Sequence, residues 1–166
     1  MEAQIHWYKK WYESQYQLFL EDQQIGEVSP VAFSSKTVAC LSGQKYLFRP
    51  KGILLRKVEI TDAASQEKLG KICFTGAGIT GTIILNTKEA FQLRCINILA
   101  ARWAISQRGH DLITYTGNHM QGKIKAENAD QLLLLAGLYA SIFQWRKILL
   151  LLIILVPLVV IFLRTI

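Results

Sequence analysis

The stretch FTGAGITG, residues 74–81, places Gly76, Gly78 and Gly81 at the G-x-G-x-x-G spacing of a phosphate-binding turn. In a dinucleotide-binding fold this pattern follows a strand and opens a helix, and an acidic residue follows about twenty positions later. A strand-like run, LGKICF, does precede the glycines, but the β-branched residues after Gly81 favour another strand, and Glu89 comes too early. The pattern therefore predicts a tight or bulged connection between two strands.

The other residue types that perform catalysis lack the spacing that catalysis requires. The histidines show no HExxH pattern, no pair of cysteines has zinc-ligand spacing, and no serine or cysteine stands in a nucleophile elbow. The three cysteines, Cys40, Cys73 and Cys95, are odd in number and widely separated, which favours reduced thiols of a cytosolic compartment. We therefore expect no enzyme, and no catalytic, cofactor or metal site.

A long apolar segment lies near the carboxyl end of the sequence. From Ile148 to Leu163 the chain reads ILLLLIILVPLVVIFL, without a charged or hydrogen-bonding side chain. As a helix it spans about 24 Å, and residues at its ends can reach the interfaces of a bilayer core of roughly 30 Å. Four residues are expected there: Trp145, Arg146, Lys147 and Arg164. We expect one transmembrane helix over residues 146–166; the alternative is a buried core helix.

A shorter apolar run, LLLLAGLYASIF, covers Leu132–Phe143. It is too short to cross a bilayer, and a short helix that is apolar on every face is typical of a protein core. Asp130 or Asn128 stands where an N-cap is expected, and Gly137 would let a neighbouring backbone approach. We expect two helices in different surroundings, which either join as one rod or form a hairpin that crosses the bilayer twice.

The formal net charge is +7, and the excess of Lys and Arg is spread along the chain. An arginine-rich tract and zinc or RNA-binding signatures are missing from the sequence, which argues against nucleic acid as a partner. A basic surface suits the anionic cytoplasmic face of a membrane. Because most basic residues precede the apolar segment, the positive-inside rule predicts a single-pass membrane protein with its N-terminal domain in the cytoplasm.

Between Gln15 and Glu127, short apolar or alternating runs separated by polar turns indicate β-strands. The clearest are YQLFL, KYLFR, GILLRKVEI, LGKICF, GTIIL, AFQLRCI, DLITYT and GKIKA. Three joints resemble one another, because each has a polar turn followed by Gly, a charged residue and a β-branched residue: LEDQQIGEV (20–28), TDAASQEKLGKI (61–72) and TGNHMQGKI (116–124). They predict serial antiparallel hairpins, whose edges disappear when the sheet closes around LLLLAGLYASIF.

The amino-terminal residues 1–14 are rich in aromatic and basic side chains. Residues 6–12 read HWYKKWY and include Trp7, Lys9, Lys10 and Trp11. This composition is typical of a membrane interface, and we expect these four residues to lie there. The alternative is an amphipathic element that covers one end of the barrel.

Serial hairpins with Gly-x-β-branched joints, followed by the wholly apolar run LLLLAGLYASIF, resemble the tubby-like C-terminal superfamily, which includes LURP-one-related proteins and phospholipid scramblases. The resemblance covers about residues 15–143 and implies a β-barrel threaded by a hydrophobic helix, associated with membranes through phosphoinositide or acyl anchors. The sequence departs from that pattern because it is short for a twelve-strand barrel, lacks a cysteine-rich acylation stretch and continues into a second apolar run. No basic position matches a phosphoinositide site, so no functional residue carries over.

The sequence thus predicts a mainly β protein. We expect an antiparallel barrel or roll over residues 15–145 around a central helix at 130–145, and then the transmembrane helix. The expected function is non-enzymatic: a membrane-anchored protein that binds a partner protein or anionic lipid headgroups. The alternatives are a lipid-active protein of scramblase type and a small accessory subunit of a membrane protein complex, in which Gly137, Ala140 and Trp145 would form the interface.

Overall fold

A computed structural model of the chain describes residues 3–32, 34–52, 56–75, 80–97, 101–127 and 130–164. Side chains 147–152, 154, 158 and 162–164 are outside that description. Twelve strands and one helix make up the described residues: β1 (Ala3–Tyr8), β2 (Tyr16–Leu20), β3 (Gln23–Pro30), β4 (Thr37–Leu41), β5 (Gln44–Lys51), β6 (Lys57–Asp62), β7 (Lys68–Thr75), β8 (Thr80–Leu85), β9 (Ala90–Asn97), β10 (Arg102–Gln107), β11 (His110–Gly117), β12 (Gln121–Ala126) and α1 (Gln131–Arg164).

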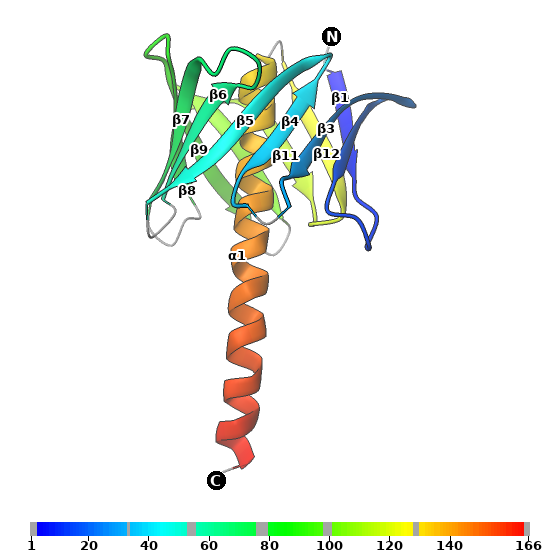
Figure 1. Ribbon diagram of the computed structural model, residues 1–166, viewed down its shortest axis with the longest axis vertical. Helices are drawn as coiled ribbons and strands as arrows, with labels where there is room; N and C mark the ends of the chain where they lie inside the picture. Colours follow the sequence, from blue (N-terminus) through cyan, green and yellow to red (C-terminus); the bar gives the residue numbers. More distant parts are fainter. Residues whose placement is uncertain are drawn as a thin grey trace.

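The strands form a closed antiparallel barrel in which each strand pairs with its neighbours in sequence. β1 pairs with both β2 and β12, so that the first strand closes the sheet against the last. Closure leaves no exposed sheet edge on which another chain could add a strand. The predicted antiparallel barrel is therefore confirmed, and Figure 1 shows it wrapped around the first part of α1.

The amino-terminal segment was expected outside the barrel, and that expectation is wrong. Part of this segment forms β1, which is one of the strands of the barrel wall. Ile5 and Trp7 point inward and are buried, whereas Gln4 and Tyr8 are exposed, which is the alternation of a half-buried strand. With β1 included, the chain is long enough for twelve strands, so its length is not a departure from a twelve-strand barrel.

The three similar joints are all hairpins, as predicted: β2–β3, β6–β7 and β11–β12. Their glycines, Gly26, Gly70 and Gly122, lie inside strands, where a side chain would collide with a neighbour. A Cβ on Gly70, for example, would lie 2.7 Å from the carbonyl oxygen of Ile84 on the adjacent strand. Glycine is required at these positions because the backbones or side chains of adjacent strands come too close for any Cβ.

The glycine-rich stretch at 74–81 joins two antiparallel strands, since Thr75 of β7 pairs with Thr80 of β8. Gly81 lies within β8, not at the start of a helix, which agrees with the predicted strand connection and removes the geometry of a dinucleotide-binding turn. Gly76 and Gly78 themselves lie outside the described residues.

The two apolar runs belong to one continuous helix, α1, so they join as one rod, and the hairpin alternative is wrong. Asp130 is the N-cap, as predicted, because its carboxylate accepts hydrogen bonds from the backbone N–H of Leu132 (2.7 Å) and Leu133 (3.3 Å). The helix enters the barrel at one end, passes along the axis and leaves at the other, below which it extends well beyond the strands (Figure 1).

Inside the barrel α1 is packed on every face. Residues 132–142 are buried throughout, and the side chains of Leu135 and Leu138 are fully enclosed. A Cβ on Gly137 would collide with the ring of Tyr115, whose hydroxyl donates a hydrogen bond to the carbonyl of Leu134 at 2.9 Å. Complete burial raises the pKa of this tyrosine well above its usual value. The apolar run at 132–143 is therefore the centre of the core, as predicted.

Beyond the barrel the described apolar side chains of α1 are exposed. They are Ile153, Leu155, Val156, Val159, Val160 and Ile161. Within the described residues, none of the helix is both long enough and apolar enough to qualify as a membrane span.

The enclosed part of the helix predicts a clear difference between two matched substitutions. Leu135→Asp places a carboxylate in the dry centre of the barrel, at a cost of several kcal/mol that approaches the whole stability of a small domain. Leu155→Asp changes a side chain that is 50% exposed, outside the barrel. We expect limited proteolysis in detergent to digest the first variant throughout and to leave a resistant barrel in the second. Equal resistance of the two variants would contradict the assignment of the core.

Candidate functional site

The path of α1 distinguishes the two ends of the barrel. The end from which the helix leaves is called the exit end. The opposite end is called the far end. The ring of His119, in the β11–β12 connection, lies 6.2 Å from that of Trp145, where the helix emerges. Because neighbouring strands are antiparallel, the connections after β1, β3, β5, β7, β9 and β11 are at the exit end. The connections after the even-numbered strands are at the far end.

An exposed aromatic pair marks the β1–β2 connection at the exit end. Trp11 is 83% exposed and Tyr12 65%, and their rings meet edge to face at 5.6 Å. The ammonium of Lys10 lies 3.0 Å from the carboxylate of Glu13 and 5.7 Å from the Tyr12 ring. Its hydrogen bond to Glu13 raises the pKa of Lys10, so the lysine is charged at neutral pH.

Further contacts bring this connection close to the emerging helix. The backbone N–H of Lys9 donates to the carbonyl of Met120 at 2.7 Å, which joins the β1–β2 and β11–β12 connections. The Lys9 ammonium also lies 5.5 Å from the ring of Tyr16. Burial raises the pKa of Tyr16, and the positive charge of Arg146 opposes that rise.

Six residues at the exit end lie in the β1–β2 connection or on α1 where it emerges, and we call them the exit rim: Lys9, Lys10, Trp11, Tyr12, Trp145 and Arg146. All but Tyr12 were predicted from the sequence as membrane-interface residues. Each is exposed or half-buried. Aromatic rings and basic side chains around an apolar helix are the composition of a membrane interface.

The remaining interface predictions differ in outcome. The expectation of an interfacial ring does not fit Trp7, which is only 4% exposed and belongs to the core. The side chains of Lys147 and Arg164 lie outside the described residues, although both positions belong to α1. Gly137 and Ala140, expected at an interface with a partner subunit, are enclosed by the barrel and cannot reach another protein.

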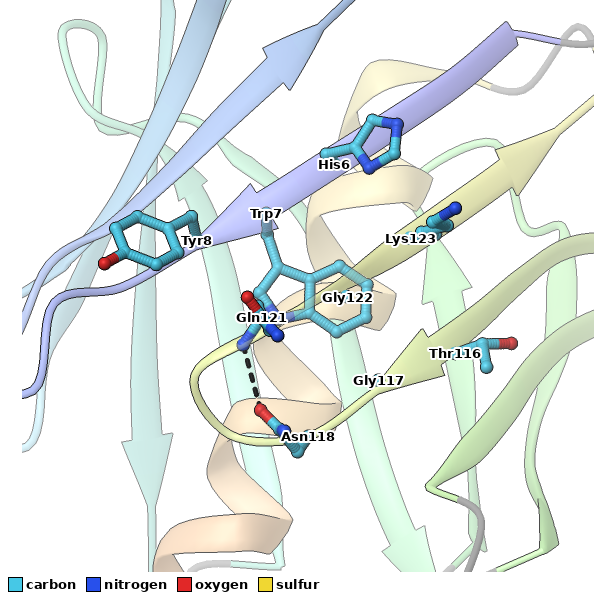
Figure 2. A pocket seen from close by; sticks show the side chains of 9 residues that line it. All are labelled: His6, Trp7, Tyr8, Thr116, Gly117, Asn118, Gln121, Gly122 and Lys123. Atoms are coloured by element: carbon cyan, nitrogen blue, oxygen red, sulfur yellow. Dashed lines mark hydrogen bonds between the residues drawn. The ribbon is translucent and has the colours of Figure 1, made fainter.

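A groove lies on the barrel wall next to the exit rim, where β1, β12 and β11 run side by side (Figure 2). Its volume is about 530 Å³. It is lined by His6, Trp7, Tyr8, Thr116, Gly117, Asn118, Gln121, Gly122 and Lys123. No local sequence signal predicts this groove, because it depends on the pairing of the first strand with the last.

The register of the three strands explains the shape of the groove. Trp7, Gly122 and Gly117 form one row across the strands, and the indole fills the space that side chains on the two glycines would occupy. The next row contains His6 and Lys123, which are directly paired. In the β11–β12 turn the backbone N–H of Gln121 donates to the side chain of Asn118 at 3.0 Å (Figure 2).

The polar side chains of the groove are suited to anions or neutral polar groups. Lys123 supplies an ammonium, and the histidine, tyrosine, threonine and amide side chains supply further donors. The lining includes no carboxylate. The described residues contain no cluster of His, Cys, Asp or Glu that would hold a metal ion, and Cys40, Cys73 and Cys95 are unpaired, half-buried thiols.

Comparison with known proteins gives a likeness of fold. The chain matches no protein-family model. It also matches no curated protein sequence. The crystal structure of a protein from Arabidopsis thaliana superposes with a TM-score of 0.60 at 12% sequence identity, covering 86% of this chain and 90% of the plant protein. The barrel architecture is therefore shared with a plant protein, and the likeness is compatible with a β-barrel superfamily.

The contact between Trp7 and Gly122 generates a testable coupling. A methyl group in Gly122→Ala would overlap the indole, and we expect the free energy of unfolding to fall by about 1–3 kcal/mol. Combining it with Trp7→Leu should relieve part of the overlap, so that the double variant is less destabilised than the sum of the two by about 1 kcal/mol. Denaturant unfolding measures both effects.

The matched control for this cycle is Gly81→Ala. A methyl group there would lie 2.8 Å from the carbonyl oxygen of Cys73 and has no contact with Trp7. We therefore expect its effect to add to that of Trp7→Leu. Additive behaviour of Gly122→Ala as well would show that the indole does not set the requirement for glycine.

Proposed function

We propose that the protein is a membrane-anchored, non-enzymatic barrel whose exit rim contacts lipid headgroups on the cytoplasmic face of a membrane. The observation that carries the proposal is the continuity of α1, which fills the barrel and then continues, still helical, beyond the exit rim to Arg164. One helix therefore joins the folded domain to the apolar segment at 148–163 without a linker.

The outer part of α1 supports the anchor because the described part of the barrel leaves its described side chains exposed. The described side chains between Ile153 and Ile161 are apolar and 45–68% exposed. Leaving such surface in water costs about 25 cal/mol per Å². Transfer of a Leu, Ile, Val or Phe residue to the bilayer centre is favourable by about 0.3–0.6 kcal/mol, which sums to several kcal/mol over this segment.

The exit rim supports headgroup contact. Its two tryptophans and three basic residues lie at the end of the barrel from which the apolar segment emerges. In an anchored protein they would lie at the depth where tryptophan is enriched and where anionic lipid attracts Lys and Arg. The groove with Lys123 and His6 is close to the same end and offers further donors to phosphate oxygens.

A partner membrane protein is the second candidate for the outer helix. The observation in its favour is the group of exposed Val156, Val159 and Val160 side chains, which a second helix could cover as well as lipid does. Purification of the native protein in mild detergent distinguishes the two. A stoichiometric partner that stays with the protein favours the accessory-subunit function, and isolation as a single chain favours lipid.

Flotation with liposomes tests the anchor directly. We expect the full chain to float with uncharged phosphatidylcholine vesicles. Leu155→Asp should weaken insertion by about 2.5–3.5 kcal/mol, roughly a 100-fold loss of membrane partitioning, because it places a carboxylate near the bilayer centre. Leu155→Ala is the matched control and should float as the parent protein does. Equal flotation of the Asp and Ala variants would place the anchor elsewhere.

A further inference from the structure

The acidic side chains of the barrel are concentrated at its far end. Of the twelve Asp and Glu residues in the chain, eight lie in or directly beside the far-end connections: Glu21, Asp22, Asp62, Glu67, Glu89, Asp111, Glu127 and Asp130. In or directly beside the exit-end connections the described residues include one acid, Glu13, which is paired with Lys10, and the carboxylate of Glu59 on β6 lies 3.3 Å from the ammonium of Lys51. The negative charge of the molecule is thus displaced along the barrel axis away from the emerging helix.

Basic side chains are more numerous at the exit end. Among the described side chains, five lie in or beside the far-end connections (Lys45, Lys68, Lys88, Arg108 and Lys125), whereas eight lie in or beside the exit-end connections or on the emerging helix: Lys9, Lys10, Lys36, Lys51, Arg56, Lys57, Arg102 and Arg146. They come from four different connections and from α1, so they surround the exit end instead of forming a patch on one wall. Exposed apolar groups accompany them, with Trp11 at 83%, Tyr12 at 65% and Val31 at 39% exposure.

The part of α1 that joins the barrel to the anchor is too short to let the barrel turn away from the membrane. Gln144 is the last enclosed residue of α1 and is only 3% exposed. The apolar segment begins at Ile148, four residues later, which is about 6 Å along a helix. The headgroup layer on each side of a bilayer has a similar thickness. The helix is continuous through this interval, so the axis of the barrel follows that of the anchor (Figure 1).

We infer that the barrel docks end-on: the whole exit end lies against an anionic lipid surface, and the acidic far end points away from it. The inference rests on the proposed membrane anchor and adds a second contact, made by residues of the β3–β4, β5–β6 and β9–β10 connections that the exit rim does not include. Anionic lipid complements the basic exit end and repels the acidic far end, so the charges along the barrel select this orientation over one in which a wall faces the bilayer.

Lysine labelling of the full chain in lipid nanodiscs tests the orientation, because the barrel carries matched lysines at both ends. Lys36 and Lys57 are exposed at the exit end, and Lys45 and Lys88 at the far end. Lys51 and Lys68 are left out of the comparison, because both ammonium groups contact the carboxylate of Glu59 on the wall, at 3.3 and 3.7 Å. The protein is labelled with a water-soluble acetylating ester in uncharged detergent, in phosphatidylcholine discs and in discs that also contain phosphatidylserine. Mass spectrometry gives the labelling rate of each lysine.

We expect the exit-end lysines to be labelled several-fold more slowly in phosphatidylserine discs than in detergent, and the far-end lysines to keep their rates. Unchanged rates at both ends, with the protein retained in the discs, would overturn end-on docking and leave the anchor intact. Failure of the protein to enter the discs would instead overturn the anchor. Equal protection at both ends would place a barrel wall on the lipid and overturn the inference.

Two triple variants with the same change in charge add a matched comparison. The exit-end variant combines Lys36→Glu, Arg56→Glu and Arg102→Glu, and the far-end variant combines Lys45→Glu, Lys88→Glu and Arg108→Glu. All six side chains are exposed, and among the described residues none forms an ion pair, so both variants should fold. We expect only the exit-end variant to lose the phosphatidylserine-dependent protection of Lys57. Loss in both variants, or in neither, would contradict the assignment of the docking surface.

Discussion

The structure depends on filling the interior of a barrel that is too wide for the side chains of its own wall to fill. An eight-stranded barrel is just narrow enough for side chains from its wall to fill the centre, and the diameter grows with the number of strands. Twelve strands therefore leave a central space, and α1 occupies it. A helix suits this role because its backbone groups bond to one another and its side chains can be apolar on every face. The stacking of Phe48 on Tyr139, at 4.5 Å, shows how closely wall and helix meet.

This solution has a mechanical consequence for the rest of the molecule. The segment that occupies the core is the same helix that leaves the barrel, so the direction of the outer segment is set by packing around Leu135, Leu138 and Gly137. In a protein with a linker, the barrel and an anchor would be oriented independently. Here the position of the exit rim relative to the outer helix follows from the fold, and His119 from the β11–β12 connection lies beside Trp145.

The elements with local signals could be predicted from the sequence. The N-cap at Asp130, the all-round apolar run of α1 and the three hairpins with an internal glycine each depend on residues close together in the chain. β10 (RWAISQ) was not recognised, because four consecutive residues from Trp103 to Ser106 are buried and a bulge between Ile105 and Ser106 interrupts the alternation. β1 was not recognised because its role depends on pairing with β12, more than a hundred residues away.

The two parts of the candidate site differ in the same way, because one has a local sequence signal and the other depends on residues far apart in the chain. The exit rim was visible in composition, since aromatic and basic residues cluster in HWYKKWY and around Trp145. The groove was not, because His6 and Lys123 become neighbours only when the barrel closes. Trp7 and Trp11 show the limit of composition most clearly. Both stand in one basic, aromatic segment, yet Trp7 occupies an inward position of a strand and is buried, whereas Trp11 follows the end of that strand and is exposed. Strand alternation, which composition ignores, therefore decides which of the two aromatic rings is exposed.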